Sequence, residues 1–315
     1  MNTESNPVQQ SPLGSQATAP ASVSTPWPFY WSVRRELWEN RSIYFAPLAV
    51  AAVVLLGSVI SLVGVPRSVR GVTTLDPAMQ SAMLAHPYAH IAMLLLATGI
   101  LVGVFYSLDA LQGERRDRSI LFWKSLPVSD LTTVLSKAII PLVILPLIIF
   151  VTTAVLQFLM LVMSSAMLLA SGVGVTTLWT RLPLFQMQLV LLYGLIVIAL
   201  WHAPIYAWLL FVSGWARRAT FLWAVLPLVA LGVFEWIAFR TSYFGALMKD
   251  RLFGFAAHAF SFHLPGNAPV DPHFIPLALL SPGKFLGTPG LWLGLIVAAA
   301  FLAAAIRLRR YREPI

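Results

Sequence analysis

The sequence predicts an all-α membrane protein with six transmembrane helices, cytoplasmic N and C termini, and an interfacial helix before the first span. Hydrophobic residues make up 58% of the 315 residues, charged residues only 10%, and the mean hydropathy is +0.80. These values lie outside the range of soluble globular domains. The apolar stretches are continuous rather than alternating, which favours membrane-spanning helices over the strands of a barrel.

The N-terminal region divides into two parts before the first span. Residues 1–26 are rich in Ser, Pro, Gln, Thr and Ala and lack the basic and apolar regions of a signal peptide, so we expect a disordered cytoplasmic tail. Residues 27–42 place aromatic side chains on one helical side and charged ones on the other, which predicts an amphipathic helix at the membrane surface. The alternative is an aromatic belt that precedes an ordinary span.

The transmembrane domain is expected to occupy residues 43–310. Most of its apolar segments reach the roughly 20 residues that cross a bilayer as a helix. The predicted spans are 43–65, 91–108, 138–170, 187–213, 221–239 and 291–306. The third is one long helix, because its length of about 50 Å at ~1.5 Å per residue is too short for two spans and a turn. The sixth is short and should borrow neighbouring residues.

Two prolines stand near the start of the third span. Pro141 and Pro146 predict a kink or a broken first turn there, because proline removes a helical hydrogen bond.

The basic residues predict the orientation of the chain. With the N terminus in the cytoplasm, 14 of the 21 Lys and Arg residues fall on cytoplasmic segments, including the last residues, 311–315. They form short clusters at helix ends, where they meet lipid headgroups, so the net charge of +9 does not indicate nucleic-acid binding. The outer segment 240–290 is too long for a simple turn, and whether it dips back into the membrane stays open.

Few residues offer chemistry within the spans. The chain has no cysteine, no phosphate-binding Gly-x4-Gly-Lys-Ser/Thr loop, no His-Glu-x-x-His and no Gly-x-Ser-x-Gly motif, so we expect no catalytic, metal or cofactor site in it. His202 in the fourth span is either a hydrogen-bond partner between helices or a substrate contact. Glu235 in the fifth span is expected to pair with Arg240 rather than to relay protons.

The cytoplasmic loop 109–137 carries the most distinctive pattern in the chain. Its charged stretch ERRDRS at 114–119 is followed by ILFWKSLPVS at 120–129 and by Ser136 and Lys137. This pattern resembles the permease subunits of ABC-2 type transporters, in which a charged segment after the second span leads through an apolar stretch and a Leu-Pro-x-Ser turn into the third span. The local match covers about 25 residues, and the six-span layout extends it less specifically over residues 27–310.

The resemblance implies a partner and a role for this loop. Such a permease pairs with a second copy or a close homologue and docks, through a coupling helix in the loop, on a cytoplasmic ATPase subunit that holds ATP and Mg. Apolar anchors among charges of both signs also suit protein docking better than lipid attraction. The docking residues predicted on this basis are Glu114, Arg115, Arg116, Asp117, Arg118, Phe122 and Trp123.

The resemblance further implies an exporter in a bacterial inner membrane, with lipid around it. The scarcity of charge in the spans favours an amphipathic or apolar substrate. Two alternatives remain open from the residues themselves. One is an ion-coupled secondary transporter, and the other is a membrane assembly or regulatory subunit that binds a partner without transporting anything.

Overall fold

The computed structural model describes residues 27–116, 129–261 and 277–311. Within these ranges the regular secondary structure is helical, and no strand forms beyond an isolated bridge between Phe260 and Leu280. Six helical segments are long and apolar enough to cross a membrane, which confirms the predicted fold class. These segments are Ser42–Val72, Pro77–Arg116, Asp130–Ala170, Thr176–Trp215, Thr220–Phe239 and Pro289–Tyr311.

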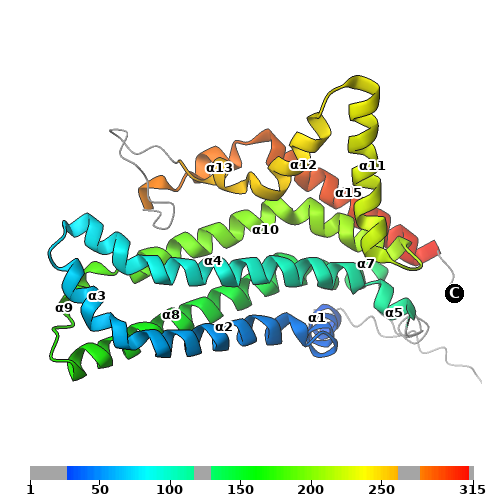
Figure 1. Cartoon of the computed structure of the whole chain (residues 1–315). Helices are drawn as coiled ribbons and strands as arrows, with labels where there is room; N and C mark the ends of the chain where they lie inside the picture. Colours follow the sequence, from blue (N-terminus) through cyan, green and yellow to red (C-terminus); the bar gives the residue numbers. More distant parts are fainter. Residues whose placement is uncertain (1–26, 117–128, 262–276, 312–315) are drawn as a thin grey trace, which may run out of the picture.

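Four long helices form the main bundle. Helices α2 (Ser42–Ser61), α4 (Pro77–Asp109), α8 (Leu145–Ala170) and α10 (Leu184–Trp215) run side by side (Figure 1). Their shared core is apolar, and Gln157 Nε2 of α8 donates to the Tyr88 carbonyl of α4 at 2.9 Å. A buried amide group therefore has its partner on the neighbouring helix, as polar groups inside a bundle require.

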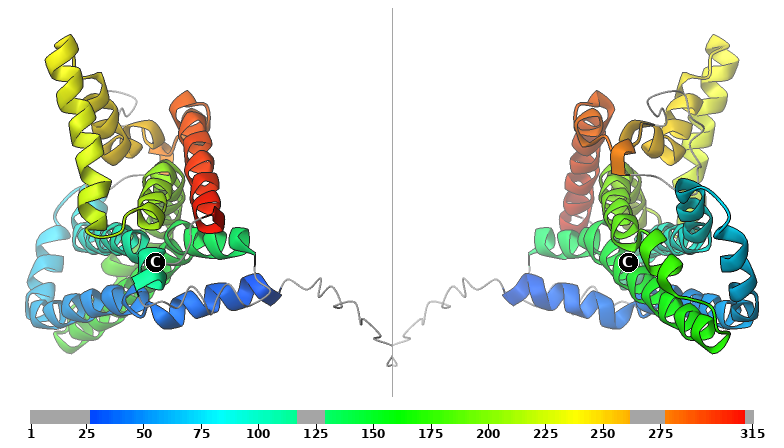
Figure 2. Two further views of the ribbon diagram at one scale, coloured as in Figure 1. Left: turned by 90° about the vertical axis from the view of Figure 1, so that its right-hand side faces the viewer. Right: turned by 90° about the vertical axis from the view of Figure 1, so that its left-hand side faces the viewer.

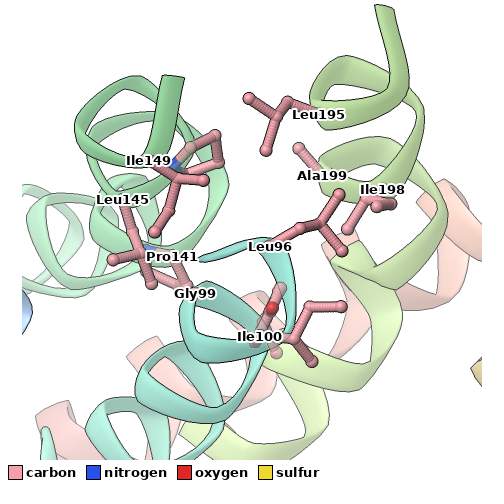
Figure 3. A pocket seen from close by; sticks show the side chains of 11 residues that line it. Leu96, Gly99, Ile100, Pro141, Leu145, Ile149, Leu195, Ile198 and Ala199 are labelled. Atoms are coloured by element: carbon pink, nitrogen blue, oxygen red, sulfur yellow. The ribbon is translucent and has the colours of Figure 1, made fainter. Parts of the chain in front are cut away.

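A small cavity lies in the described part of the bundle core. About 20 Å³ of space lies between α4, α10 and the start of α8, and its lining is almost wholly apolar (Figure 3). This volume is about that of one water molecule, and an apolar cavity of this size stays dry. Gly99 lies against Ile149 at this point, and a Cβ on Gly99 would come 2.8 Å from Ile149 Cγ1. Close contact between α4 and α8 therefore depends on this glycine.

Helix α1 (Trp27–Glu39) lies at the end of the bundle that we call the α1 end, beside α7 (Asp130–Ile139) (Figure 2). The last described residues of the chain, up to Tyr311, lie at the same end (Figure 1). Tyr30, Trp31 and Trp38 are 57%, 50% and 69% exposed, whereas Glu36 is fully buried. The aromatic side of α1 thus faces away from the protein, as a helix at a membrane surface requires.

The third span is interrupted near its start. Helix α7 passes into a π-helical turn at Ile140–Ile144, and α8 follows. Pro141 lies in this turn, and Pro146 lies in the first turn of α8. A proline has no N–H for the preceding turn, so the local backbone widens. The disruption predicted from the two prolines is present.

The second span begins earlier than its apolar stretch suggests. Helix α4 starts at Pro77, 14 residues before the predicted boundary at residue 91. Proline is well suited to a first helical turn. Gln80, in that turn, donates through Nε2 to the Leu75 carbonyl at 2.9 Å. Polar residues therefore extend the helix past the apolar core instead of ending it.

Short helices join the long ones at the other end of the bundle. A 3₁₀ turn at Leu62–Gly64 and α3 (Val65–Val72) lead from α2 toward α4, and α9 (Thr176–Arg181) leads from α8 toward α10 (Figure 1). We call this the α3 end.

Helices α11 (Thr220–Phe239) and α15 (Pro289–Tyr311) rise from one side of the bundle (Figure 2). α15 extends beyond 291–306 at both ends. Between them lie four short elements: α12 (Tyr243–Phe253), α13 (Phe255–Ala259), a 3₁₀ turn at Leu277–Leu279 and α14 (Pro282–Leu286). This part of the segment 240–290 packs back against the middle of α10, where Arg251 Nη1 donates to the Trp201 carbonyl at 3.3 Å. Arg251 Nη2 donates to the Gly290 carbonyl of α15 at 2.7 Å.

Candidate functional site: a buried ionic cluster

Charged side chains from four helices meet at the α1 end of the bundle. They come from α1, from α5 (Gln112–Arg116), from α7 and from the last turn of α15. We call the following set the ionic cluster: Arg35, Glu36, Glu114, Asp130, Lys137 and Arg309. It holds three cations and three anions. A further acid, Glu39, reaches Arg35 Nε at 3.3 Å from a half-exposed position at its edge.

Glu114 is the centre of the cluster. One carboxylate oxygen, Oε1, lies 2.6 Å from Arg35 Nη2 and 3.2 Å from Lys137 Nζ. The other, Oε2, accepts from Arg309 Nη1 at 2.5 Å. The side chain is 6% exposed. One carboxylate therefore connects α1, α7 and α15 to α5.

Glu36 forms a second centre beside the first. Lys137 Nζ donates to Glu36 Oε1 at 2.7 Å, and the Tyr106 hydroxyl donates to Oε2 at 2.9 Å. Glu36 and Lys137 are 0% and 2% exposed. Lys137 thus lies between two carboxylates, those of Glu36 and Glu114, and compensates both.

Burial makes this pairing obligatory. A charge that is removed from water costs several kcal/mol unless partners and hydrogen bonds replace its hydration. Within the cluster each buried acid has at least two donors. Removing one cation would leave a buried carboxylate undercompensated, so the cluster favours one arrangement of its four helices over neighbouring ones.

Arg309 joins the two stems of the loop that the sequence singled out. Its Nη1 contacts Glu114, which precedes the segment 117–128, and its Nε donates to Asp130 Oδ1, which follows that segment, at 3.0 Å. Both stems of the loop are therefore held by one guanidinium group of the last span.

The stem before the loop is also fixed to α10. The backbone N–H groups of Leu111 and Gln112 both donate to Ser213 Oγ at 3.0 Å. Arg115 Nη2 donates to the carbonyls of Ser213 and Ala216 at 2.7 Å each. These carbonyls belong to the C-terminal end of α10, where a cation is favoured by the helix dipole.

The structure describes only three of the seven predicted docking residues, Glu114, Arg115 and Arg116. Glu114 and Arg115 point inward, to the cluster and to α10, so they hold the stem rather than the outer surface of the loop. Arg116 is exposed, with its Nη1 3.9 Å from Asp109 Oδ1. Asp117, Arg118, Phe122 and Trp123 lie outside the described residues.

The polar residues predicted within the spans have local partners. His202 Nε2 lies 3.2 Å from the Leu252 carbonyl of α12, and Nδ1 lies 3.0 Å from the Ile198 carbonyl. His202 therefore makes a contact between helices α10 and α12, which is the first of the two roles that the sequence left open.

Glu235 has a different partner from the one expected. Its carboxylate accepts from Thr241 Oγ1 at 2.8 Å and from the backbone N–H groups of Tyr243 and Phe244 at 2.7 and 2.8 Å. Arg240 instead lies over the ring of Trp236, 5.1 Å from its centroid. The expected Glu235–Arg240 pair is replaced by a cap on the start of α12, since the carboxylate takes the free N–H groups of that helix. Arg240 ends α11 with a positive φ of 52°.

Sequence reasoning missed the cluster as a unit. It assigned Glu36 to the polar face of α1 and Arg309 to a basic cluster at a helix end. Glu114 lies 79 residues from Arg35 and 195 residues from Arg309 in the sequence, so no helical spacing connects it to these two partners. Lys137, a charge directly before an apolar span, was the one local signal.

Comparisons of the chain with protein-family models, with curated proteins and with solved structures find no match. Over the described residues, no group of three or more His, Asp or Glu side chains is placed to hold a metal ion. The candidate site is therefore assigned on the resemblance of the loop and on the geometry of its stems.

Proposed function

We propose that this chain is the membrane subunit of an ATP-driven transporter of the ABC-2 type, and that the loop 109–137 receives the movement of a separate ATPase. One observation carries the proposal furthest. The two stems of that loop meet on Arg309, at the buried end of the last span. A force applied to the loop would therefore reach several membrane helices together. The six candidate spans and the sequence pattern at 114–129 support the same assignment.

The cluster supplies a path for this movement. Displacement of Glu114 acts on Arg309 of α15 and on Arg35 of α1, and displacement of Lys137 acts on Glu36. Coupling of this kind requires an element with two arrangements whose balance the partner shifts. The π-helical turn at Ile140–Ile144 offers a deformable joint between α7 and the bundle.

The loop residues then have two roles: some contact the ATPase, and others transmit its movement to the membrane helices. Phe122 and Trp123 are the apolar anchors of the contact, and Arg116, Asp117 and Arg118 orient the partner through charge. Glu114 stays inside and transmits. A second copy of the chain or a close homologue completes the transport path, which suits an amphipathic or apolar substrate exported from a bacterial inner membrane.

The decisive experiment is purification of the tagged chain from its native membrane, followed by measurement of ATP hydrolysis. We expect a soluble subunit with a phosphate-binding loop to copurify, and expect the associated ATPase activity to fall at least tenfold in Phe122→Ala or Trp123→Ala, about 1.4 kcal/mol or more of lost binding. Arg218→Ala, an exposed basic residue between α10 and α11, is the matched control and should retain the activity.

The alternatives predict other results. A secondary transporter would purify without an ATPase and would move solute in vesicles on an ion gradient alone. A regulatory subunit would bind the ATPase but would give vesicles with no ATP-dependent transport. Either result would refute the proposal.

A further inference from the structure

A second feature lies at the α3 end of the bundle, far from the ionic cluster along α2 and α4. It is an open pocket of about 320 Å³ between α2, the 3₁₀ turn, α3, α4, α8 and α9. Ligand sites usually measure about 300–1,000 Å³, so this pocket is at the small end of that range. Its apolar side is formed chiefly by leucine, valine and methionine side chains, among them Leu84, Met83, Met160 and Met163.

The polar side of the pocket consists of hydroxyl groups. Ser58, Ser61, Ser68, Ser164 and Tyr88 line it. No lining residue carries a charge at neutral pH. The pocket is therefore unsuited to an ion or to a charged headgroup, because the lining offers no opposite charge to compensate a charged ligand.

Three of these serines already donate their hydroxyl proton to a backbone carbonyl. Ser58 Oγ donates to the Val54 carbonyl at 2.8 Å, and Ser61 Oγ donates to the Ser58 carbonyl at 2.8 Å. Ser68 Oγ donates to the Gly64 carbonyl at 3.2 Å. A hydroxyl has one proton and two lone pairs, so each of these serines keeps its acceptor capacity. A ligand that fits them must bring donors.

The position along the bundle limits the ligand further. Helix α2 has 20 residues, about 30 Å at 1.5 Å per residue, so its last turn lies at one boundary of a bilayer core. A molecule at this depth meets lipid chains on one side and headgroups or water on the other. Apolar methionines beside acceptor hydroxyls match an amphiphile whose chain is apolar and whose head is uncharged.

We propose that this pocket binds a single-chain, uncharged amphiphile that carries hydroxyl donors, such as a monoacylglycerol. The hydroxyls of its head donate to the serines of α2 and α3, and its chain lies against Met160 and Met163. The exposed arginines of α3, Arg67 and Arg70, are not part of the lining, so an anionic headgroup is not the ligand that the pocket selects. This site does not depend on the proposed partnership with an ATPase.

The test uses the full chain in phosphatidylcholine nanodiscs and a monoacylglycerol with a photoreactive diazirine in its acyl chain. After irradiation, mass spectrometry of peptides should locate the label on α4 and α8 around Met83, Met160 and Met163. Unlabelled monooleoylglycerol should compete, and methyl oleate, which has the same chain but no hydroxyl donor, should compete at least fivefold less, from the loss of about 1 kcal/mol per hydrogen bond. Equal competition by methyl oleate would overturn the proposal and indicate a lipid chain alone.

Two variants of the protein complete the test. Gly64 lines the pocket and a Cβ there meets nothing within 4 Å, so a side chain can start at this position and Gly64→Leu is expected to occupy the pocket. It should abolish labelling at this site. The double variant Ser61→Ala, Ser68→Ala should weaken monooleoylglycerol competition roughly fivefold or more. Ser81→Ala, a helical serine outside the lining with the same bond to its own helix, is the control and should behave as the wild type. Unchanged labelling in Gly64→Leu, or unchanged competition by monooleoylglycerol in the double serine variant, would refute the proposal.

Discussion

Arg309 Nη1 lies 2.5 Å from Glu114 Oε2, although 195 residues separate the two in sequence. The side chains of Arg309 and Glu114 are 5% and 6% exposed. This contact ties the last span to the stem of the loop between the second and third spans. Because Arg309 also contacts Asp130 at 3.0 Å, it fixes the distance between the two stems of the loop.

Replacement of Arg309 should therefore destabilise the α1 end of the protein. Arg309→Ala leaves Glu114 with two of its three cations, and we expect a loss of about 3 kcal/mol, at the lower limit for breaking a buried ion pair. Thermal unfolding in nanodiscs measures the effect. Arg310→Ala, its exposed neighbour, is the matched control and should change stability by less than about 0.5 kcal/mol.

A double-mutant cycle distinguishes the pair from general damage. Glu114→Gln in the Arg309→Ala background should cost much less than Glu114→Gln alone, because the two side chains share one interaction. Additive losses would show that the contact between Arg309 and Glu114 contributes nothing specific.

Lys137 should be the most sensitive single position in the cluster. Lys137→Met removes the ammonium between the Glu36 and Glu114 carboxylates, and we expect a loss of about 3–5 kcal/mol. Adding Glu36→Gln should recover part of this loss, because one buried negative charge disappears. Chemical unfolding followed by circular dichroism measures both variants, with Lys249→Met on the exposed side of α12 as the control. A double variant no more stable than Lys137→Met would contradict this account.

The spans were predictable because each depends on a local property. Continuous apolar segments predicted the six membrane-spanning helices, and Pro141 predicted the disruption in the third span. The boundaries were less predictable, as the start of α4 at Pro77 shows: polar residues such as Gln80 find backbone partners and continue the helix. Hydropathy reports the lipid-facing length of a helix rather than its hydrogen-bonded length.

The ionic cluster could not be predicted from the same information. Glu36 has the sequence context of an exposed polar face, yet the fold places Lys137 and Tyr106 against it. Only the packing of α1 on α7 decides which side of α1 becomes internal. Likewise, Glu114 stands in a charged stretch that suits a partner, and its burial follows from the approach of α15.

Gly99 is predicted to control the packing of α4 on α8 at the cavity in Figure 3. Gly99→Ala would place its Cβ 2.8 Å from Ile149 Cγ1, so Ile149 must move, and overpacking of this kind costs about 1–3 kcal/mol. Gly57→Ala in α2 meets nothing within 4 Å and should be neutral or slightly stabilising. Thermal unfolding of both variants checks this. Ile149→Val in the Gly99→Ala background should restore part of the loss, and its failure to do so would refute the contact.

Glu235 is predicted to order the start of α12. Glu235→Ala removes the acceptor for the N–H groups of Tyr243 and Phe244, so both amides should exchange hydrogen faster. Hydrogen-exchange mass spectrometry over residues 240–250 measures this. Arg240→Ala should leave the same amides unchanged, because Arg240 lies on Trp236 rather than on the carboxylate. Faster exchange in Arg240→Ala as well would contradict this account and would favour the ion pair between Glu235 and Arg240 that the sequence predicts.

Gly294 is predicted to make room for Arg251 between α10 and α15. The guanidinium group lies 4.4 Å from the ring centroid of Trp201 and donates to the Gly290 carbonyl. A Cβ on Gly294 would clash with Nη2 of this group and would come 2.8 Å from its Cζ. Gly294→Ala should therefore displace the flexible end of Arg251. Stability should fall by about 1–2 kcal/mol, from the loss of the arginine's hydrogen bonds to the Trp201 and Gly290 carbonyls and of its contact with the Trp201 ring. The substitution should also change the tryptophan fluorescence, because Trp201 loses its cation.

The control for this prediction stands on the same helix. At Gly290 a Cβ meets Thr288 Cγ2 and the Trp201 ring atom Cη2 at 3.8 Å, ordinary contact distance, and the carbonyl that accepts from Arg251 is kept. Gly290→Ala should therefore leave both the unfolding temperature and the fluorescence close to those of the wild type. Arg251→Ala should reproduce the fluorescence change of Gly294→Ala, and in the Arg251→Ala background the further change Gly294→Ala should cost little. If Gly294→Ala costs as much without the arginine as with it, the glycine serves the packing of α15 and not the position of Arg251.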